Sequence, residues 1–200
     1  MLHYRYARGD MVFRAGEMCE SFYFVVNGQV RLYVASATGV EKVIELIGPG
    51  HSFAEAMMFL SKHYTLNAQA LADTLILTVS KQAVFDEIER DPRFSMQMLC
   101  GISHWLHRLL LDVEGYALHS GMQRLIGYLL RDVELESTAD FGVVTVSFPV
   151  SKATIASRLS LTPEYFSRVL HQLESEKLIE IDKRAVHILD VRRLASYGAH

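Results

Sequence analysis

Hydrophobic and polar residues alternate in short runs over residues 9–80, and this pattern predicts a region of short strands. Strands are expected at Phe22–Val26, Val30–Ala35, Lys42–Ile47, Leu66–Ala72 and Leu75–Ser80. Asn27-Gly28 favours a type I′ hairpin between the first two, because both central residues of that turn adopt positive φ. Strands at this spacing predict a small sandwich or barrel. A short helix is expected next, over Lys81–Arg90.

From Pro92 the apolar residues follow the helical period instead. A seam spaced by threes and fours consists of Ser95, Leu99, Ile102, Leu106, Leu109, Val113 and Tyr116. Met98, Trp105 and Leu110 lie beside the seam, so the apolar face is wider than a coiled coil requires. Two interpretations are open, a helix buried within one chain or a dimerisation helix. The continuity of the seam favours dimerisation through its members from Leu99 to Tyr116.

Ser120 and Gln123 form a capping box, which predicts a new helix running to about Val133. The acidic, turn-rich stretch Glu134–Asp140 separates this helix from a strand over Val143–Phe148. The expected organisation is therefore a strand-rich domain over residues 1–90, a long helix over 91–119 and a second domain over 120–200.

Residues 151–173 predict two short helices joined by a tight turn. Ser151 caps the first helix, whose buried side is Ile155, Ala156 and Leu159. After the turn at Ser160-Leu161, Thr162 is an N-cap with Pro163 at the first helical position. The second helix has an apolar face of Phe166, Val169, Leu170 and Leu173 and a polar face of Glu164, Ser167, Arg168 and His171. Two helices joined this tightly, the second with a polar outer face, are typical of a helix-turn-helix.

A hairpin is expected after these helices, with strands at Leu178–Ile181 and Ala185–Ile188. Its tip carries Lys183 and Arg184, which suit contacts with DNA phosphates. The candidate DNA-binding residues are therefore Lys152, Thr162, Glu164, Ser167, Arg168, His171, Lys183 and Arg184.

The formal net charge of −3 gives no global attraction to nucleic acid, but the charge is unevenly distributed. Residues 1–119 hold 10 Lys and Arg against 13 Asp and Glu, and residues 120–200 hold 10 against 10. Within Ser151–Leu173, Lys152, Arg158 and Arg168 stand against Glu164 alone, a local balance of +2. The basic footprint is therefore expected on the helix-turn-helix and the hairpin tip.

Other features of composition limit the class of protein. Half of the 200 residues are apolar, which excludes a disordered chain. No apolar stretch is long enough for a transmembrane helix, and the first residues lack the apolar region of a secretory signal, so we expect no membrane partner. Two cysteines, Cys19 and Cys100, fit a protein of the reducing cytoplasm.

The order of these parts resembles the CRP/FNR superfamily of bacterial transcription regulators, over about residues 9–190. Glu164-Tyr165-Phe166-Ser167-Arg168 matches the Glu-x-x-Ser-Arg pattern of its FNR-like branch. The resemblance implies an α+β fold: an N-terminal jelly-roll-like β-barrel similar to cyclic-nucleotide-binding domains, a long dimerisation helix and a C-terminal winged helix-turn-helix.

The same resemblance implies a homodimer that binds double-stranded DNA and contacts RNA polymerase. It also implies that Arg168 reads guanine and that Glu164 accepts from cytosine or adenine in a palindrome containing TTGA. Arginine–guanine and carboxylate–cytosine pairs are ordinary contacts in the major groove. An effector is expected to rotate the DNA-binding domains about His119-Ser120-Gly121.

Three effectors are usual in this superfamily. An iron–sulfur cluster needs four thiolates, which two cysteines cannot supply. Cyclic-nucleotide binding is disfavoured, because Tyr64 stands where the family has its phosphate-binding arginine and Lys62 is the only nearby cation, although Glu55 is present to hold a ribose hydroxyl.

The stretch Phe53–Phe59, together with the recognition segment, resembles the Dnr branch of nitric-oxide-responsive regulators of denitrification, which implies haem b as the cofactor. The candidate effector-binding residues are Glu55, Met58, Tyr64, His104 and His107, with His51 and His63 nearby. The axial ligand stays open, and Met58 is alternatively part of the core. Family members usually carry a helical segment before the barrel, so either this chain is shortened or it lacks that segment.

Two other functions were weighed. A cupin-like enzyme is disfavoured because the chain has no His-x-His pair, no Gly-x-Ser-x-Gly elbow and no glycine-rich phosphate loop. A regulator that acts without any effector is the remaining alternative.

Overall fold

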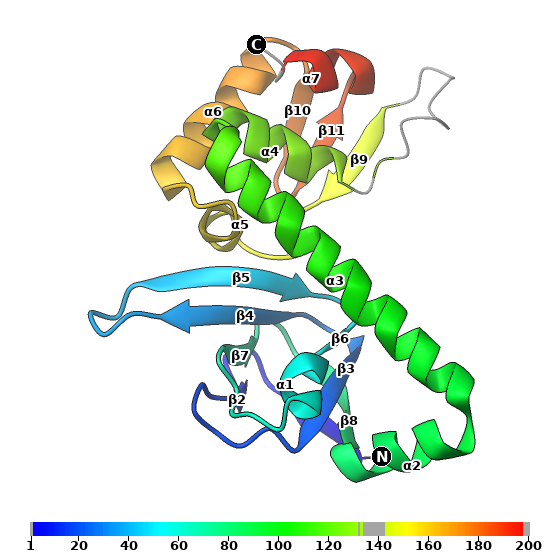
Figure 1. Ribbon diagram of the computed structural model, residues 1–200. Coiled ribbons are helices and arrows are strands. Elements are labelled where there is room, and N and C mark those ends of the chain that lie inside the picture. The colour runs from blue at the N-terminus through cyan, green and yellow to red at the C-terminus, as the bar shows by residue number, and fades with distance from the viewer. Residues whose placement is uncertain (1, 132, 134–142, 198–200) are drawn as a thin grey trace. The chain divides into compact units, whose positions relative to one another are not determined.

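The computed structural model describes residues 2–131, 133 and 143–197 (Figure 1). The chain forms two compact units, residues 1–110 and 111–200. The boundary between them falls inside the long helix α3 (Pro92–Leu118). None of the described helices is long and apolar enough to cross a membrane. The two units are described in turn.

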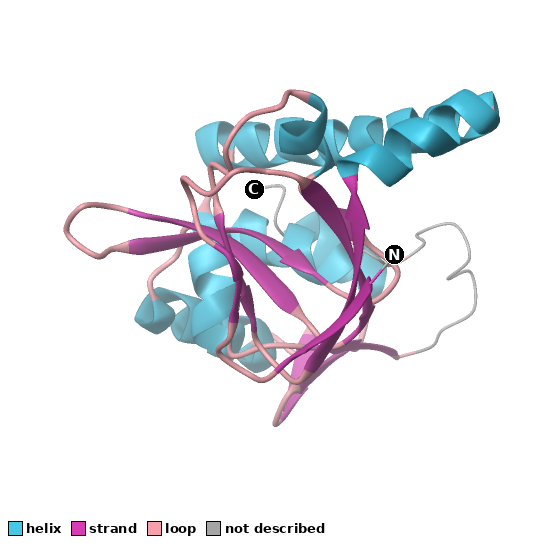
Figure 2. Cartoon of the chain, turned by 90° about the horizontal axis from the view of Figure 1, so that it is seen from below, coloured by secondary structure: helices cyan, strands magenta, loops and turns pink. Residues whose placement is uncertain are grey.

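Short antiparallel strands build the first unit (Figures 1 and 2). They are β1 (Leu2–Tyr6), β2 (Met11–Phe13), β3 (Ser21–Asn27), β4 (Val30–Ala35), β5 (Glu41–Ile47), β6 (Ser52–Phe53), β7 (Asn67–Ala70) and β8 (Thr74–Ser80). Within the described residues, one sheet has the order β1-β8-β3-β6 and the other the order β2-β7-β4-β5. Both sheets contribute side chains to one core, including Val25 and Ile76 from the first and Leu32 and Ala68 from the second. The jelly-roll-like prediction is confirmed as a two-sheet sandwich, whereas its closure into a barrel is wrong.

The predicted hairpin at Asn27-Gly28 is also wrong, although strands β3 and β4 lie where they were expected. Strand β3 pairs with β8 and β6, while β4 pairs with β5 and β7, so Gly28 carries the chain from one sheet to the other. Gly28 has a φ of 94°, but Asn27 is not among the residues with positive φ, which a type I′ turn requires. A Cβ on Gly28 would lie 2.6 Å from the carbonyl oxygen of Asp73. Glycine is needed here for the crossing and not for a hairpin.

Several short elements had no visible sequence signal. Strand β1 is almost wholly exposed, so it lacks the alternation of a half-buried strand. Strands β2 and β6 and the one-turn helix α1 (Glu55–Phe59) are too short to show a period.

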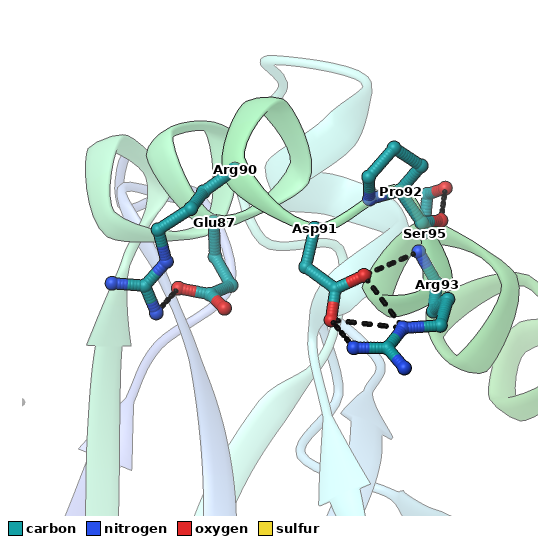
Figure 3. Close-up of polar contacts among 6 residues, drawn as sticks. All are labelled: Glu87, Arg90, Asp91, Pro92, Arg93 and Ser95. Atoms are coloured by element: carbon teal, nitrogen blue, oxygen red, sulfur yellow. Dashed lines mark hydrogen bonds and ion pairs between the residues drawn. The ribbon is translucent and has the colours of Figure 1, made fainter.

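The corner between helix α2 (Lys81–Arg90) and helix α3 is fixed by local side-chain contacts (Figure 3). A carboxylate oxygen of Asp91 accepts from the backbone N–H of Arg93 at 3.0 Å, and the Arg93 guanidinium donates to Asp91 at 2.8 Å. These hydrogen bonds from Arg93 lower the pKa of Asp91. Pro92 then begins the helix, where its missing N–H costs nothing. The prediction that α2 spans Lys81–Arg90 and that a long helix follows is confirmed.

The second unit begins within α3 and contains short helices around a small sheet (Figure 1). Its further elements are α4 (Gly121–Leu130), β9 (Val144–Ser147), α5 (Lys152–Arg158), α6 (Pro163–Ser175), β10 (Ile179–Asp182), β11 (Ala185–Ile188) and α7 (Val191–Tyr197). The sheet order is β10-β11-β9. The capping box is confirmed, because the Ser120 hydroxyl accepts from the Gln123 backbone and the Gln123 side chain accepts from the Ser120 backbone. The expected acidic stretch Glu134–Asp140 lies outside the described residues.

Candidate DNA-binding surface and ligand cavity

The two helices α5 and α6 start and turn at the residues that the sequence indicated. Ser151 accepts from the backbone N–H of Thr154, and Thr162 accepts from that of Tyr165, each at 3.2 Å. Ser160 takes a φ of 55° in the turn between the helices. Because each cap satisfies a backbone donor at a helix start, both starts are fixed by local chemistry.

Helix α6 separates its apolar and polar faces as predicted. Phe166, Val169, Leu170 and Leu173 are buried in the core of this unit. On the other face Glu164, Arg168 and His171 are exposed and Ser167 is half-buried. The Arg168 guanidinium lies 4.8 Å from the centre of the Tyr165 ring, which is a favourable cation–π contact. The exposed face therefore presents an arginine and a carboxylate one turn apart.

A shallow depression of about 460 Å³ lies beside this face. It is lined by Gly121, Arg124, Ser160, Leu161, Thr162, Glu164, Tyr165 and Arg168. Arg124, from helix α4, was not among the predicted DNA-binding residues, and it brings a second guanidinium to the rim of the recognition helix. The sequence did not indicate that Arg124 lies beside α6, because the two are far apart in the chain.

The predicted hairpin is confirmed as β10 and β11, which pair from Ile179–Ile188 to Asp182–Ala185. Lys183 and Arg184 form the two-residue tip and are both exposed, with Lys183 at a φ of 50°. Lys152 is exposed at the first position of α5.

One cation of the expected basic footprint does not reach the surface. Arg158 is 6% exposed, and its guanidinium donates to Asp112 at 2.5 Å. A buried arginine paired with a carboxylate is not available for contact with DNA phosphates. Among the exposed side chains of Ser151–Leu173, Lys152 and Arg168 stand against Glu164, so the exposed balance is +1, compared with the +2 counted from the sequence.

The first unit contains a cavity of about 510 Å³ between the sandwich and the middle of the long helix. The sandwich contributes apolar side chains, among them Phe13, Leu32, Ile47 and Leu66. Residues of α3 that line it are Gly101, Ile102, His104, Trp105, His107 and Arg108. Its size and its mostly apolar walls with a few polar groups are typical of a small-molecule site.

Four of the predicted effector residues, Glu55, Tyr64, His104 and His107, line this cavity. Met58 does not line it: the side chain is completely buried in the core of the sandwich, and the neighbouring Met57 lines the cavity instead. This corrects the assignment of Met58, because one turn of helix sends adjacent side chains in different directions. Of the two further histidines considered, His51 lines the cavity.

Tyr64 lines the cavity as a neutral phenol. Its ring stacks on Phe13 with 3.7 Å between ring centres, and its hydroxyl donates to the carbonyl oxygen of Ser21 at 3.2 Å. Burial, followed by the hydrogen bond with Tyr23, raises the pKa of Tyr64. Tyr64 therefore supplies no charge to a bound ligand.

The charged groups of the cavity are Glu55 and Arg108. Burial raises the pKa of the Glu55 carboxyl. Arg108 brings a guanidinium from the long helix, while Lys62, the cation considered from the sequence, does not line the cavity. The expectation that Lys62 is the only nearby cation is therefore wrong, because a fold-dependent contact supplies Arg108. In the part of the chain that is described, no three His, Cys, Asp or Glu side chains are grouped to hold a metal ion.

The predicted seam of the long helix divides between three surroundings. Leu99, Leu106 and Val113 are 55%, 54% and 63% exposed, which leaves an apolar stripe on the helix. Ile102 instead lines the cavity, and Leu109 is half-buried. Tyr116 belongs to the second unit, where its hydroxyl donates to the carbonyl oxygen of Arg158 at 2.6 Å. A helix of 3.6 residues per turn rotates such a seam out of one plane along its length.

Comparison with known protein families agrees with this arrangement. Residues 4–91 match the family model of the cyclic nucleotide-binding domain, and residues 123–197 match that of the Crp-like helix-turn-helix domain. The chain belongs to the CRP/FNR family of transcription regulators.

Individual members of the family are similar over nearly the whole chain. The transcriptional activatory protein AadR of Rhodopseudomonas palustris is 28% identical over 98% of this chain and 81% of its own. The Cyclic AMP receptor protein of Thermus thermophilus is 23% identical over 94% of this chain and 84% of its own. The structure of FixK2 from Bradyrhizobium japonicum has a TM-score of 0.86 at 22% identity and covers 100% of this chain and 98% of that one. The last likeness supports the fold alone.

Proposed function

We propose that this CRP/FNR regulator is a cytoplasmic homodimer that binds a palindrome containing TTGA and responds to a small effector in the cavity of its first unit. The observation that carries the proposal is the face of α6, where Glu164 and Arg168 are exposed one turn apart above a fully buried opposite face. In this proposal the protein acts on transcription together with RNA polymerase and is not an enzyme.

The exposed residues of the second unit divide into base-reading and phosphate-binding groups. Arg168 donates to guanine and Glu164 accepts from cytosine or adenine, and each such pair contributes ~1–3 kcal/mol of discrimination. Lys152, Thr162, Ser167, His171, Lys183 and Arg184 position the unit on the phosphates. Because the surface carries few net positive charges, binding depends strongly on the base contacts and on the geometry of the dimer.

Dimerisation through the exposed stripe of α3 would explain a palindromic site, because a two-fold symmetric dimer binds two equivalent half-sites. Two recognition helices must lie ~34 Å apart to enter successive major grooves on one face of DNA. Leu99, Leu106 and Val113 leave apolar area uncovered in a single chain, and a second copy of the same helix would cover it. Leu106→Glu should therefore give monomers in sedimentation, and a persistent dimer would refute this interface.

The DNA-binding assignment is tested by Arg168→Ala. The variant should bind the TTGA palindrome and a scrambled duplex with equal affinity, because the guanine contact is lost, and it should remain dimeric. Arg192→Ala is a matched control, since this exposed arginine of α7 is not among the proposed contacts. A preference for TTGA that survives in Arg168→Ala would refute the assignment.

For the effector we propose haem b, with nitric oxide as the signal. Haem needs an apolar slot, an axial donor and cations for its propionate groups. The cavity offers apolar walls, the imidazoles of His104 and His107 and the guanidinium of Arg108, so its residues fit the group. The iron of a bound haem would supply the site for nitric oxide. The chain's own residues would hold the macrocycle and exclude water from it.

A cyclic nucleotide is the second candidate, and Arg108 is the observation that favours it. A phosphate in a partly apolar cavity needs a cation, and Arg108 provides one where Tyr64 cannot. Glu55 lines the same cavity and is suited to accept from a ribose hydroxyl. The domain family that residues 4–91 match is also named for cyclic-nucleotide binding.

The fluorescence of Trp105 reports on binding of either candidate, because the only tryptophan of the chain lines the cavity. Haem should quench its fluorescence and give a saturable Soret band that shifts with nitric oxide and is lost in His104→Ala or His107→Ala. Quenching by cyclic AMP that disappears in Arg108→Gln would favour the nucleotide. Response to neither ligand would leave a regulator without an effector of these classes.

A further inference from the structure

Arg158 is a nearly buried arginine that the proposed DNA contacts do not use. It is the last residue of α5, and its guanidinium donates to the carboxylate of Asp112 at 2.5 Å and to the hydroxyl of Tyr116 at 2.9 Å. The Tyr116 hydroxyl in turn donates to the carbonyl oxygen of Arg158 at 2.6 Å. Asp112 and Tyr116 lie one turn apart near the end of the long helix. All three residues belong to the second unit.

The position of Arg158 in the chain makes this contact mechanically important. The residues immediately after it, Leu159–Leu161, form the turn that leads into the recognition helix. Its main-chain carbonyl and its side chain are both bonded to α3, so the end of α5 is held in position and in orientation. A guanidinium at this depth requires a partner charge, because an unpaired buried charge is strongly unfavourable.

A second close contact joins the same segments. A Cβ on Gly121, the first residue of α4, would lie 2.5 Å from Cε1 of Tyr165 and 2.8 Å from Cδ2 of Leu161. The α3–α4 corner is therefore packed against the turn and the first residues of the recognition helix. This contact follows the corner in sequence, whereas the contacts of Asp112 and Tyr116 precede it.

We infer that Asp112, Tyr116 and Arg158 form a latch that fixes the end of the long helix to the helix-turn-helix and so positions the recognition helix. The inference rests on the proposed DNA-binding function and names residues that act through α5 and α6 and do not touch DNA. The segment His119-Ser120-Gly121 therefore has hydrogen-bonded contacts before it, at Asp112 and Tyr116, and a close packing contact at its end, at Gly121.

Removal of the partner charge tests the latch. Asp112→Asn keeps the shape of the side chain but removes the carboxylate that the Arg158 guanidinium contacts. In amide hydrogen exchange of the full-length dimer, residues 113–118 and 155–161 should exchange about tenfold faster than in the wild type, a change of the size that contacting pairs produce. Strands β10 and β11 should be unaffected. Glu114→Gln is the matched control, because it removes an exposed carboxylate from the same turn of helix.

A positioning role is separated from a merely structural one by DNA binding and by a double-mutant cycle. Asp112→Asn should lower affinity for the TTGA palindrome about tenfold while the dimer and the thermal unfolding of the first unit stay unchanged. Arg158→Gln should have a similar effect. Asp112→Asn with Arg158→Gln should be no worse than either alone, because the amides replace an ion pair that either single change already breaks.

Several outcomes would overturn the latch. They are exchange rates that do not change in Asp112→Asn, equal effects of Asp112→Asn and Glu114→Gln, and strictly additive effects of the two latch substitutions. Failure of the proposed function would be distinguishable, because the wild type would then not distinguish the palindrome from a scrambled duplex. The exchange measurement needs no DNA and would still decide whether the latch exists.

Discussion

The recognition surface of the second unit and the cavity of the first unit are assembled in different ways. The recognition surface comes from one short stretch, Lys152–His171, with the hairpin tip added. The cavity combines residues of several strands, the one-turn helix α1 and the long helix. A site built from consecutive residues inherits its geometry from helix caps and periodicity, whereas a site built from distant segments depends on how the sandwich packs.

The two regions also treat charge differently. Glu164 and Arg168 are exposed to solvent, where their polar groups are accessible to base edges. In the cavity, burial raises the pKa of Glu55 and of Tyr64, so these groups are biased towards their neutral forms. The surface is suited to a charged, hydrated partner, and the cavity to a largely apolar ligand with a few polar groups.

The largest expected effect tests whether the two units are independently stable. Phe166→Ala removes a fully buried ring of the second unit and should cost about 3–5 kcal/mol there. Urea unfolding followed by circular dichroism should then show an early step for this unit. Trp105 fluorescence, which reports on the first unit, should keep its midpoint.

The half-exposed Phe85 of the first unit is the control for this experiment. Phe85→Ala should cost less and should move the Trp105 transition instead. A shift of the Trp105 midpoint in Phe166→Ala as large as the shift seen by circular dichroism would contradict the independence of the units.

An intermediate effect is expected at the sheet crossing of the first unit. Gly28→Ala places a Cβ at positive φ against Asp73 and Thr74 and should cost about 1–3 kcal/mol in the Trp105 transition. Gly39→Ala separates the two causes, because Gly39 also has positive φ but has open space around it. Equal costs for the two substitutions would show that crowding at the crossing contributes nothing.

The smallest effect concerns the pH dependence of the first unit. Because burial raises the pKa of Glu55, the folded state holds this proton more tightly than the unfolded state. The stability that Glu55 contributes is therefore fully present below its ordinary pKa and is lost as the pH rises through the raised value.

Glu55→Gln should remove that loss. Above the raised pKa the variant should gain stability relative to the wild type, on the order of 1 kcal/mol or less, and below the ordinary pKa the gain should vanish. Unfolding followed by Trp105 fluorescence across the acidic range measures the difference. Parallel stability curves for the two proteins would contradict the raised pKa.

The second unit was largely predictable from sequence because its signals are local. The caps at Ser120, Ser151 and Thr162 and the apolar face of α6 all lie where the spacing indicated. The burial of Arg158 and its ion pair were not predictable, because its partner Asp112 is far away in the chain. In the first unit most strands were found, but the partner strands of β3 and β4 were not, because Asn27-Gly28 suits both a hairpin and a crossing between sheets.

The sequence by itself therefore determined the order of strands, long helix and helix-turn-helix, and the residues that face outward on the recognition helix. Periodicity and capping act over a few residues, so they can be read along the chain. Only the tertiary structure decided that Arg108 and Tyr64 line one cavity, that Met58 is core and that Arg158 is paired with Asp112. These outcomes depend on contacts between distant segments, which packing creates and which no local pattern records.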